Sequence, residues 1–119
     1  EITFVNVGQG DGAVIQAPYR FNVLIDGGGG NSYSDYNPGE KVYLDYLETE
    51  GITKADSAFV SHYHQDHVQG IIAAMENIKV RNLIWRAVNG VRHLKIPQGK
   101  TAQQCITFHR KHFLLIVTE

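Results

Sequence analysis

Four side chains that can bind a metal ion occur within one short segment, His62-Tyr63-His64-Gln65-Asp66-His67. Imidazole and carboxylate groups are ligands for Zn, Fe and Mn in proteins. His62 and His64 are two residues apart, so in an extended segment they point to the same side. A turn at Gln65 can then bring Asp66 and His67 toward the same point. The spacing therefore predicts a metal centre for one or two ions, and two adjacent ions can hold a hydroxide that attacks a substrate.

The alternative is a surface loop that is rich in histidine by coincidence. That alternative requires three imidazoles and a carboxylate to gather where a buried strand, expected at Ser57–Ser61, meets a helix, expected at Val68–Asn77. We therefore favour the metal-site hypothesis.

The segments before and after this motif have the patterns of a mixed α and β protein. Short runs rich in β-branched and aromatic residues, separated by Gly- and Pro-containing turns, predict an antiparallel meander at the start of the chain. Its three strands are expected at Ile2–Val7, Ala13–Ala17 and Phe21–Ile25. An apolar stripe predicts a helix at Gly39–Glu50, which ends at Gly51. Asn-Gly at positions 89–90 predicts a hairpin between Val80–Val88 and Val91–Ile96, and a last strand is expected at Phe113–Val117.

The histidine motif resembles the His-x-His-x-Asp-His signature of the metallo-β-lactamase fold superfamily at all four ligand positions. Two further segments strengthen the resemblance. Asn6–Asp11 is similar to the Val-Gly-Gln-Gly-Asp motif of the ComEC-type branch, the competence proteins that pass DNA into bacteria. Leu24–Gly28 matches the Leu-Ile-Asp-Gly-Gly motif that closes the third strand in that branch. The resemblance extends over residues 2–85.

The resemblance implies a metal-dependent hydrolase that uses Zn²⁺, or Mn²⁺ or Fe, as one or two ions. It implies that His62 and His64 belong to a first metal site and that Asp66 and His67 belong to a second, with Asp66 as the candidate catalytic residue. It implies that Asp26 holds the ligand loop without binding metal, which agrees with the need of a metal-bound imidazole for an orienting partner. The alternative for Asp26 is a turn residue at the end of a strand.

The implied fold class is α+β: half of an αβ/βα sandwich, with a mixed, mainly antiparallel sheet and two helices on one face. We expect residues 1–119 to form a single, truncated domain, because the family fold usually needs about twice this length. The family's later ligands have no clear match, since His109 and His112 lie outside a glycine-rich loop and beside Arg110 and Lys111. Gln69 also replaces a glycine that is usual in the family. We therefore expect metal to be weakly bound or absent in this fragment.

Charge divides the chain into an acidic and a basic part. The formal net charge is −1, but residues 1–76 carry three basic and eleven acidic groups, whereas residues 77–119 carry eight basic groups and only Glu119. One interpretation is that the basic residues of 79–111 contact an anionic partner such as DNA. The alternative is a chance partition of solvated faces.

Other features of the sequence concern disulfide bonds, membrane spans and cellular location. Cys105 is the single cysteine, so the chain has no internal disulfide and its redox compartment cannot be deduced. No apolar run is long enough for a membrane span. The resemblance implies a bacterial protein, attached to a membrane protein and facing outward if it is part of a competence protein, and cytoplasmic otherwise.

Three functional hypotheses follow. The first is hydrolysis of phosphodiester bonds in DNA by a metal-bound hydroxide. The second is hydrolysis of a small ester, lactone or thioester in the same fold, and the third is an inactive fragment that serves as a binding or assembly module. Half of a sandwich would leave one apolar sheet face open, so we also expect a homo-oligomer that buries this face between copies.

Overall fold

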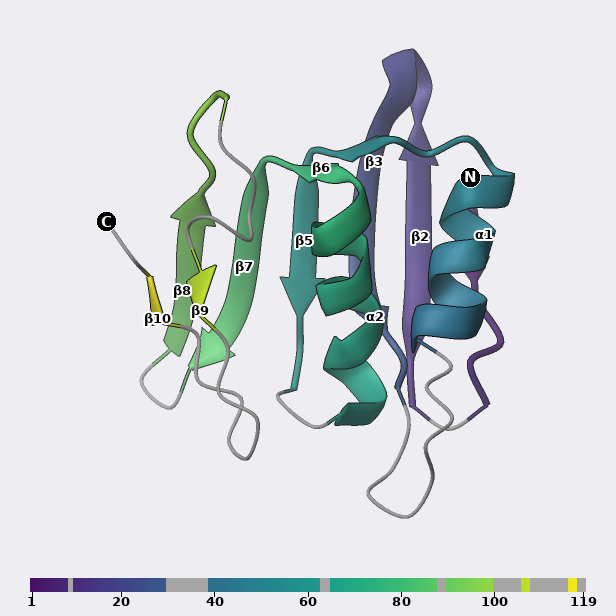
Figure 1. Ribbon diagram of the computed structural model, residues 1–119, viewed down its shortest axis with the longest axis horizontal. Helices are drawn as coiled ribbons and strands as arrows, with labels where there is room; N and C mark the ends of the chain where they lie inside the picture. Colours follow the sequence, from purple (N-terminus) through teal and green to yellow (C-terminus); the bar gives the residue numbers. More distant parts are fainter. Residues whose placement is uncertain are drawn as a thin grey trace.

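The computed structural model describes residues 1–8, 10–29, 39–62, 65–87, 90–99, 106–107 and 116–117. Its centre is a six-stranded sheet in the order β1-β2-β3-β5-β7-β8 (Figure 1). The strands are β1 (Ile2–Phe4), β2 (Gly12–Ala17), β3 (Phe21–Gly27), β5 (Ser57–Val60), β7 (Asn82–Ala87) and β8 (Gly90–Lys95).

The sheet is mixed and mainly antiparallel, which confirms the expected class. β1, β2 and β3 form the antiparallel meander, and β7 and β8 form an antiparallel hairpin. β5 lies between β3 and β7 and pairs with both in parallel. Parallel neighbours need a crossover connection, and the helical segments supply one before β5 and one after it.

Two α-helices, α1 (Leu44–Thr49) and α2 (Gln65–Asn77), lie on the same face of the sheet, as the family resemblance implies (Figure 1). A single π-helical stretch, η2 (Gly39–Tyr43), leads into α1, so only the second half of the helix expected at Gly39–Glu50 is α-helical. α2 begins at Gln65, three residues before the predicted start. Asp66 and His67 therefore lie in its first turn, where a carboxylate interacts favourably with the helix dipole.

The remaining elements are short. A 3₁₀ turn, η1 (Pro18–Arg20), joins β2 to β3, and β4 (Lys54–Ala55) pairs in parallel with β6 (Lys79–Val80). β9 (Ile106–Thr107) pairs with β10 (Ile116–Val117). Most of the strand expected at Phe113–Val117 falls outside the described residues.

Several predicted strands are longer than the observed ones, including the one predicted at Ser57–Ser61, since β5 ends at Val60. The strand predicted at Ile2–Val7 ends at Phe4. The one predicted at Val80–Val88 is divided at Arg81. Val80 belongs to β6, which pairs with β4 outside the main sheet, and the main-sheet strand β7 begins at Asn82.

The hydrophobic core lies between the helices and the sheet. Its fully buried side chains come from strands, from both α-helices and from η2, and include Val14, Leu24, Tyr43, Leu47, Ala58, Ile71 and Leu83. Trp85 is partly buried and packs against this core. No helix in the described part of the chain is long and apolar enough to cross a membrane.

The opposite face of the sheet carries many apolar side chains that are exposed or partly exposed. Alternation along each strand places Phe4, Phe21 and Phe59 on this face, and they are 83%, 49% and 39% exposed. Their neighbours in the sheet include Ile2, Ile15, Val23, Ile25, Ile84 and Val91. We refer to these nine residues together as the open sheet face.

Candidate metal centre

Two parallel strands and one helix place the candidate site at one edge of the sheet. Asp26 lies near the end of β3, and Ser61 follows the end of β5. Because β3 and β5 are parallel neighbours, their carboxyl ends meet at the same edge. His67 in the first turn of α2 lies beside them.

Asp26 is buried and accepts hydrogen bonds on both carboxylate oxygens. The Ser61 backbone N–H donates to Oδ1 over 2.8 Å, and the Ser61 hydroxyl forms a short hydrogen bond with Oδ2. His67 Nδ1 lies 3.2 Å from the same Oδ2. Asp26 also has a φ of +49°, a left-handed conformation that aspartate tolerates better than most residues. These contacts suit Asp26 to hold the ligand segment, because its oxygens are already engaged.

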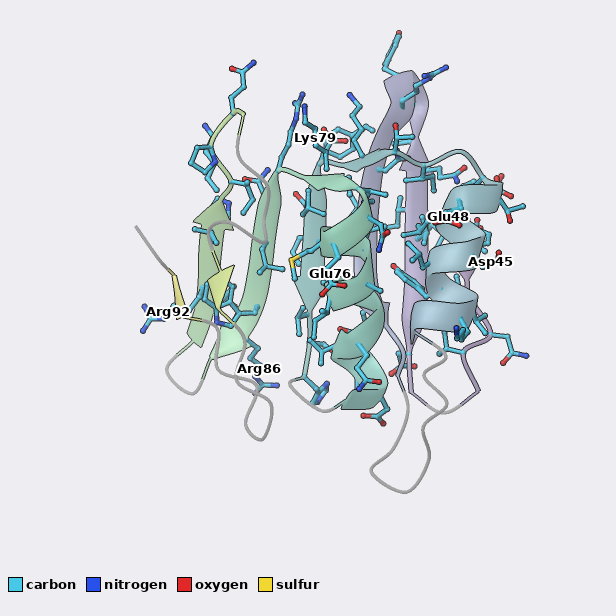
Figure 2. All side chains as sticks on the ribbon, viewed as in Figure 1. Asp45, Glu48, Glu76, Lys79, Arg86 and Arg92 are labelled. Carbon is cyan, nitrogen blue, oxygen red and sulfur yellow. The ribbon has the colours of Figure 1, made fainter. Side chains whose placement is uncertain are left out.

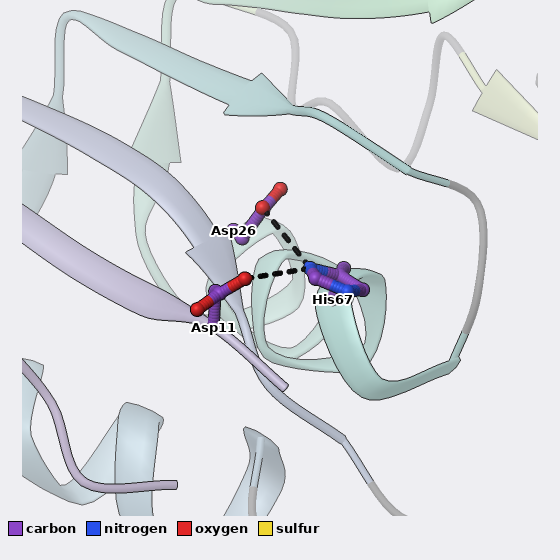
Figure 3. A group of neighbouring side chains, drawn as sticks. All are labelled: Asp11, Asp26 and His67. Carbon is purple, nitrogen blue, oxygen red and sulfur yellow. Dashed lines mark hydrogen bonds and ion pairs between the residues drawn. The ribbon is translucent and has the colours of Figure 1, made fainter. Parts of the chain in front are cut away.

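His67 is the centre of the cluster (Figure 3). Its Nδ1 lies 3.6 Å from Asp11 Oδ2, and its Nε2 lies 3.8 Å from Asp66 Oδ2. Its ring lies beside that of His62, with centroids 4.9 Å apart and planes tilted by 38°. The structure thus brings together His62, Asp66, His67 and Asp26. His64 falls outside the described residues, as do His109 and His112.

Asp11 belongs to this cluster, and the sequence analysis did not name it as a site residue. One ligand atom each from Asp11, Asp26 and His67 lie within 4.8 Å of one another. The signal was present in the glycine-rich motif that ends at Asp11. Gly10 has a φ of +88°, and a Cβ there would collide with the Asp66 carbonyl. Only glycine therefore lets this loop lie against the start of α2 and carry Asp11 to His67.

A second close approach sets the distance between α2 and β3. A Cβ on Gly27 would lie 2.5 Å from Gly70 Cα, and a Cβ on Gly70 would overlap the Gly27 carbonyl. The Gly70 N–H also donates to the Gly28 carbonyl over 3.1 Å. This contact between backbones holds the first turn of α2 against the end of β3, and so holds His67 against Asp26.

The donor set of the site fits a metal ion. Three carboxylates, from Asp11, Asp26 and Asp66, lie within 4 Å of one imidazole, and a second imidazole lies beside it. Neighbouring carboxylates disfavour one another's charge unless a cation balances them. Nitrogen and carboxylate ligands in one place are a set that Zn²⁺ accepts.

Behind the site, Tyr43 is fully buried and its hydroxyl donates to the Ala13 carbonyl over 3.0 Å. Burial raises the pKa of the Tyr43 phenol well above its ordinary value, and the negative charge of Asp26 raises this pKa further.

Comparison with known proteins gives one informative match. No protein-family profile matches the chain, and no solved structure matches it. The chain is similar to ComE operon protein 3 of Bacillus subtilis (strain 168), with 34% identity over 94 residues, which covers 71% of this chain. It spans only 12% of that protein's length. This chain is therefore a relative of a small part of ComE operon protein 3.

Proposed function

We propose that this chain is part of a metal-dependent hydrolase of the ComEC type that cleaves phosphodiester bonds in DNA. The observation that carries the proposal is the environment of His67, which lies between Asp26 and Asp66 with the ring of His62 beside it. The similarity to ComE operon protein 3 supports a context of DNA uptake. The sandwich fold of the metallo-β-lactamase superfamily, with this chain as one half, is part of the same proposal.

In this proposal His62, His64, Asp66 and His67 hold Zn²⁺, or Mn²⁺ or Fe. When bound, the metal would supply a Lewis acid and a hydroxide nucleophile at neutral pH. Asp66 is partly exposed, so its carboxylate can contact both the ion and an attacking water. Asp26 keeps His67 oriented by accepting a hydrogen bond from its Nδ1.

Two arginines support an anionic substrate at the same edge of the sheet. Val60 of β5 lies opposite Trp85 of β7, so the next residue, Arg86, is level with Ser61. Arg92 of β8 lies opposite Trp85. Both arginines are exposed at the end of the sheet where β5 ends and α2 begins (Figure 2), with Arg92 on the helix-covered face and Arg86 on the opposite face beside Val91. Guanidinium groups there can bind backbone phosphates, as part of the proposed DNA contact along residues 79–111.

The test compares histidine variants of the same chain. We expect His62→Ala and His67→Ala each to reduce metal-dependent DNA cleavage by at least about 100-fold. Removing only a ligand's hydrogen-bond partner costs up to about 100-fold, and these variants remove the ligand itself. Tyr19→Ala is the control, because Tyr19 is fully exposed at the turn between β2 and β3, outside both the cluster and the proposed DNA contact. Zinc binding is measured by calorimetry, and cleavage is measured with added Zn²⁺ or Mn²⁺.

Each outcome decides between the three hypotheses. Metal-dependent cleavage of DNA that the control retains supports the proposal. Cleavage of small esters, lactones or thioesters but not DNA supports the second hypothesis, and no activity with any added metal supports a binding or assembly module. Because the family's later ligands have no match, we expect weak metal binding, and a tight, stoichiometric metal after purification without chelator would contradict that expectation.

We also propose that a second copy covers the open sheet face. Phe4 and Phe59 are on this face and are exposed, although large contiguous apolar patches are uncommon on monomers. A symmetric contact between two such faces buries the same residues in both copies.

A further inference from the structure

Ser61 connects Asp26 to His62. Its hydroxyl oxygen forms the short hydrogen bond with Asp26 Oδ2 and lies 2.9 Å from His62 Nδ1. Ser61 follows the last residue of β5, so the sheet holds its backbone, and its N–H donates to the other oxygen of Asp26. The hydroxyl therefore has two polar neighbours at hydrogen-bond distance, one on each side.

The number of protons decides the direction of these bonds. A serine hydroxyl has one proton to donate and can accept a hydrogen bond on its lone pairs. An ionised carboxylate can only accept, so the Ser61 proton points to Asp26. The Ser61 oxygen is then the acceptor for His62, whose Nδ1 must carry the proton. In a neutral imidazole this leaves the lone pair on His62 Nε2.

The same carboxylate acts directly on the second ring. His67 Nδ1 lies 3.2 Å from Asp26 Oδ2, so Nδ1 donates and the lone pair is on Nε2. That Nε2 is the atom that faces Asp66, at 3.8 Å. One oxygen of Asp26 thus sets the protonated nitrogen of both rings, directly for His67 and through Ser61 for His62.

We infer that Ser61 is a positioning residue that sets the tautomer of His62, so that His62 and His67 both present Nε2 as a metal ligand. The metal-ligand part of this inference rests on the proposed function, whereas the tautomer itself does not. Neither the spacing of the histidine motif nor its resemblance assigns a role to Ser61.

The first test measures the tautomer in metal-free protein. Nitrogen-15 NMR distinguishes a protonated from an unprotonated ring nitrogen, and it is recorded at about pH 8, above the ordinary imidazole pKa of about 6.5. We expect the wild-type His62 to carry its proton on Nδ1. Ser61→Ala should shift His62 toward a mixture of tautomers, and Ser61→Thr, which keeps the hydroxyl, should restore the wild-type signature. Ser57→Ala is the matched control, since Ser57 is at the other end of the same strand.

The second test measures binding of Zn²⁺ alone by calorimetry. Ser61→Ala should weaken binding roughly 10-fold, the lower end of the range for losing a ligand's hydrogen-bond partner, and Ser61→Thr and Ser57→Ala should not. A wild-type His62 protonated on Nε2, or a tautomer that Ser61→Ala leaves unchanged, would overturn the inference. If no variant binds Zn²⁺ but the NMR results are as expected, the role of Ser61 stands and the proposed function fails.

Discussion

Tyr43 supports the site from behind by packing rather than by chemistry. Its ring is fully buried and its hydroxyl donates to a strand carbonyl, so the phenol is held in its neutral form. Its pKa is raised, first by burial and then by the charge of Asp26. Ionisation is therefore much less favourable in the folded chain than in the unfolded chain.

This difference predicts a loss of stability in alkali. A folded-state pKa above the unfolded value of about 10 means that Tyr43 contributes its full stability below pH 10 and loses it as pH rises above that value. Tyr43→Phe should cost about 1 kcal/mol at neutral pH, because a buried hydrogen bond is lost. It should also flatten the fall in unfolding free energy between about pH 10 and 12.

Urea unfolding of both proteins across this pH range is the measurement. Tyr19→Phe serves as the control, because Tyr19 is fully exposed at the turn between β2 and β3. The prediction would be contradicted if the unfolding free energies of wild type and Tyr43→Phe declined in parallel above pH 10.

At the scale of elements, the contact between α2 and β3 decides the geometry of the site. Gly70 and Gly27 let the helix and the strand meet backbone to backbone. The start of η2 also lies against the backbone of Gly70, since a Cβ on Gly39 would overlap the Gly70 N–H. Asp26 precedes Gly27 by one residue, and His67 precedes Gly70 by one turn of helix. The imidazole and the carboxylate are therefore positioned by glycines that carry no chemistry themselves.

Gly70→Ala should separate the helix from the strand. Alanine in place of glycine inside a helix normally stabilises it by about 1 kcal/mol, but here the added methyl group overlaps the Gly27 carbonyl. We expect a net destabilisation of about 1–3 kcal/mol, as for overpacked cores, together with weaker zinc binding.

Urea denaturation and calorimetry measure the two effects. Glu76→Ala, at an exposed position of the same helix, should leave both nearly unchanged. A Gly70→Ala variant more stable than the wild type would show that the close approach is not needed.

At the scale of the whole molecule, the two faces of the sheet and the two halves of the sequence differ in character. One face carries both helices, with acidic side chains such as Asp45, Glu48 and Glu76, whereas the β7–β8 hairpin carries Arg86 and Arg92 (Figure 2). The other side carries the apolar residues of the open sheet face, and on β7 and β8 it also carries Arg86 and His93, which lie opposite Val91 and Ile84. Burial of these apolar side chains between two copies would remove them from water, which favours self-association.

We expect light scattering at micromolar concentration to give at least twice the 13.3 kDa of one chain. Phe59→Lys, at the centre of the open sheet face, should shift the mass toward that of one chain, because a lysine would be buried without a partner in the dimer. Tyr19→Lys replaces an aromatic residue that is fully exposed at a turn, and it should leave the mass unchanged. A wild-type mass of one chain would refute self-association.

Local pattern was sufficient to predict much of this protein. The strand predicted at Phe21–Ile25 is confirmed, and its alternation alone puts Phe21, Val23 and Ile25 on one face, because side chains of a strand alternate regardless of its partners. The short spacing of His62, Asp66 and His67 indicated one cluster, because residues so close in sequence cannot lie far apart. The meander, the hairpin and both helices followed from the same kind of local signal, whereas the mixed sheet was implied by the family resemblance.

What the pattern could not supply depends on contacts between distant segments. Asp26 and His67 are 41 residues apart, and their contact exists because β5 pairs in parallel with β3 and two glycines let α2 approach. Asp11 joins the site through a loop that touches α2, and Ser61 bridges Asp26 and His62 only because β3 and β5 end at the same edge. Spacing along a chain sets which side chains are neighbours locally, whereas close packing of separate elements decides which atoms face one another and which nitrogen of each imidazole is available to a ligand.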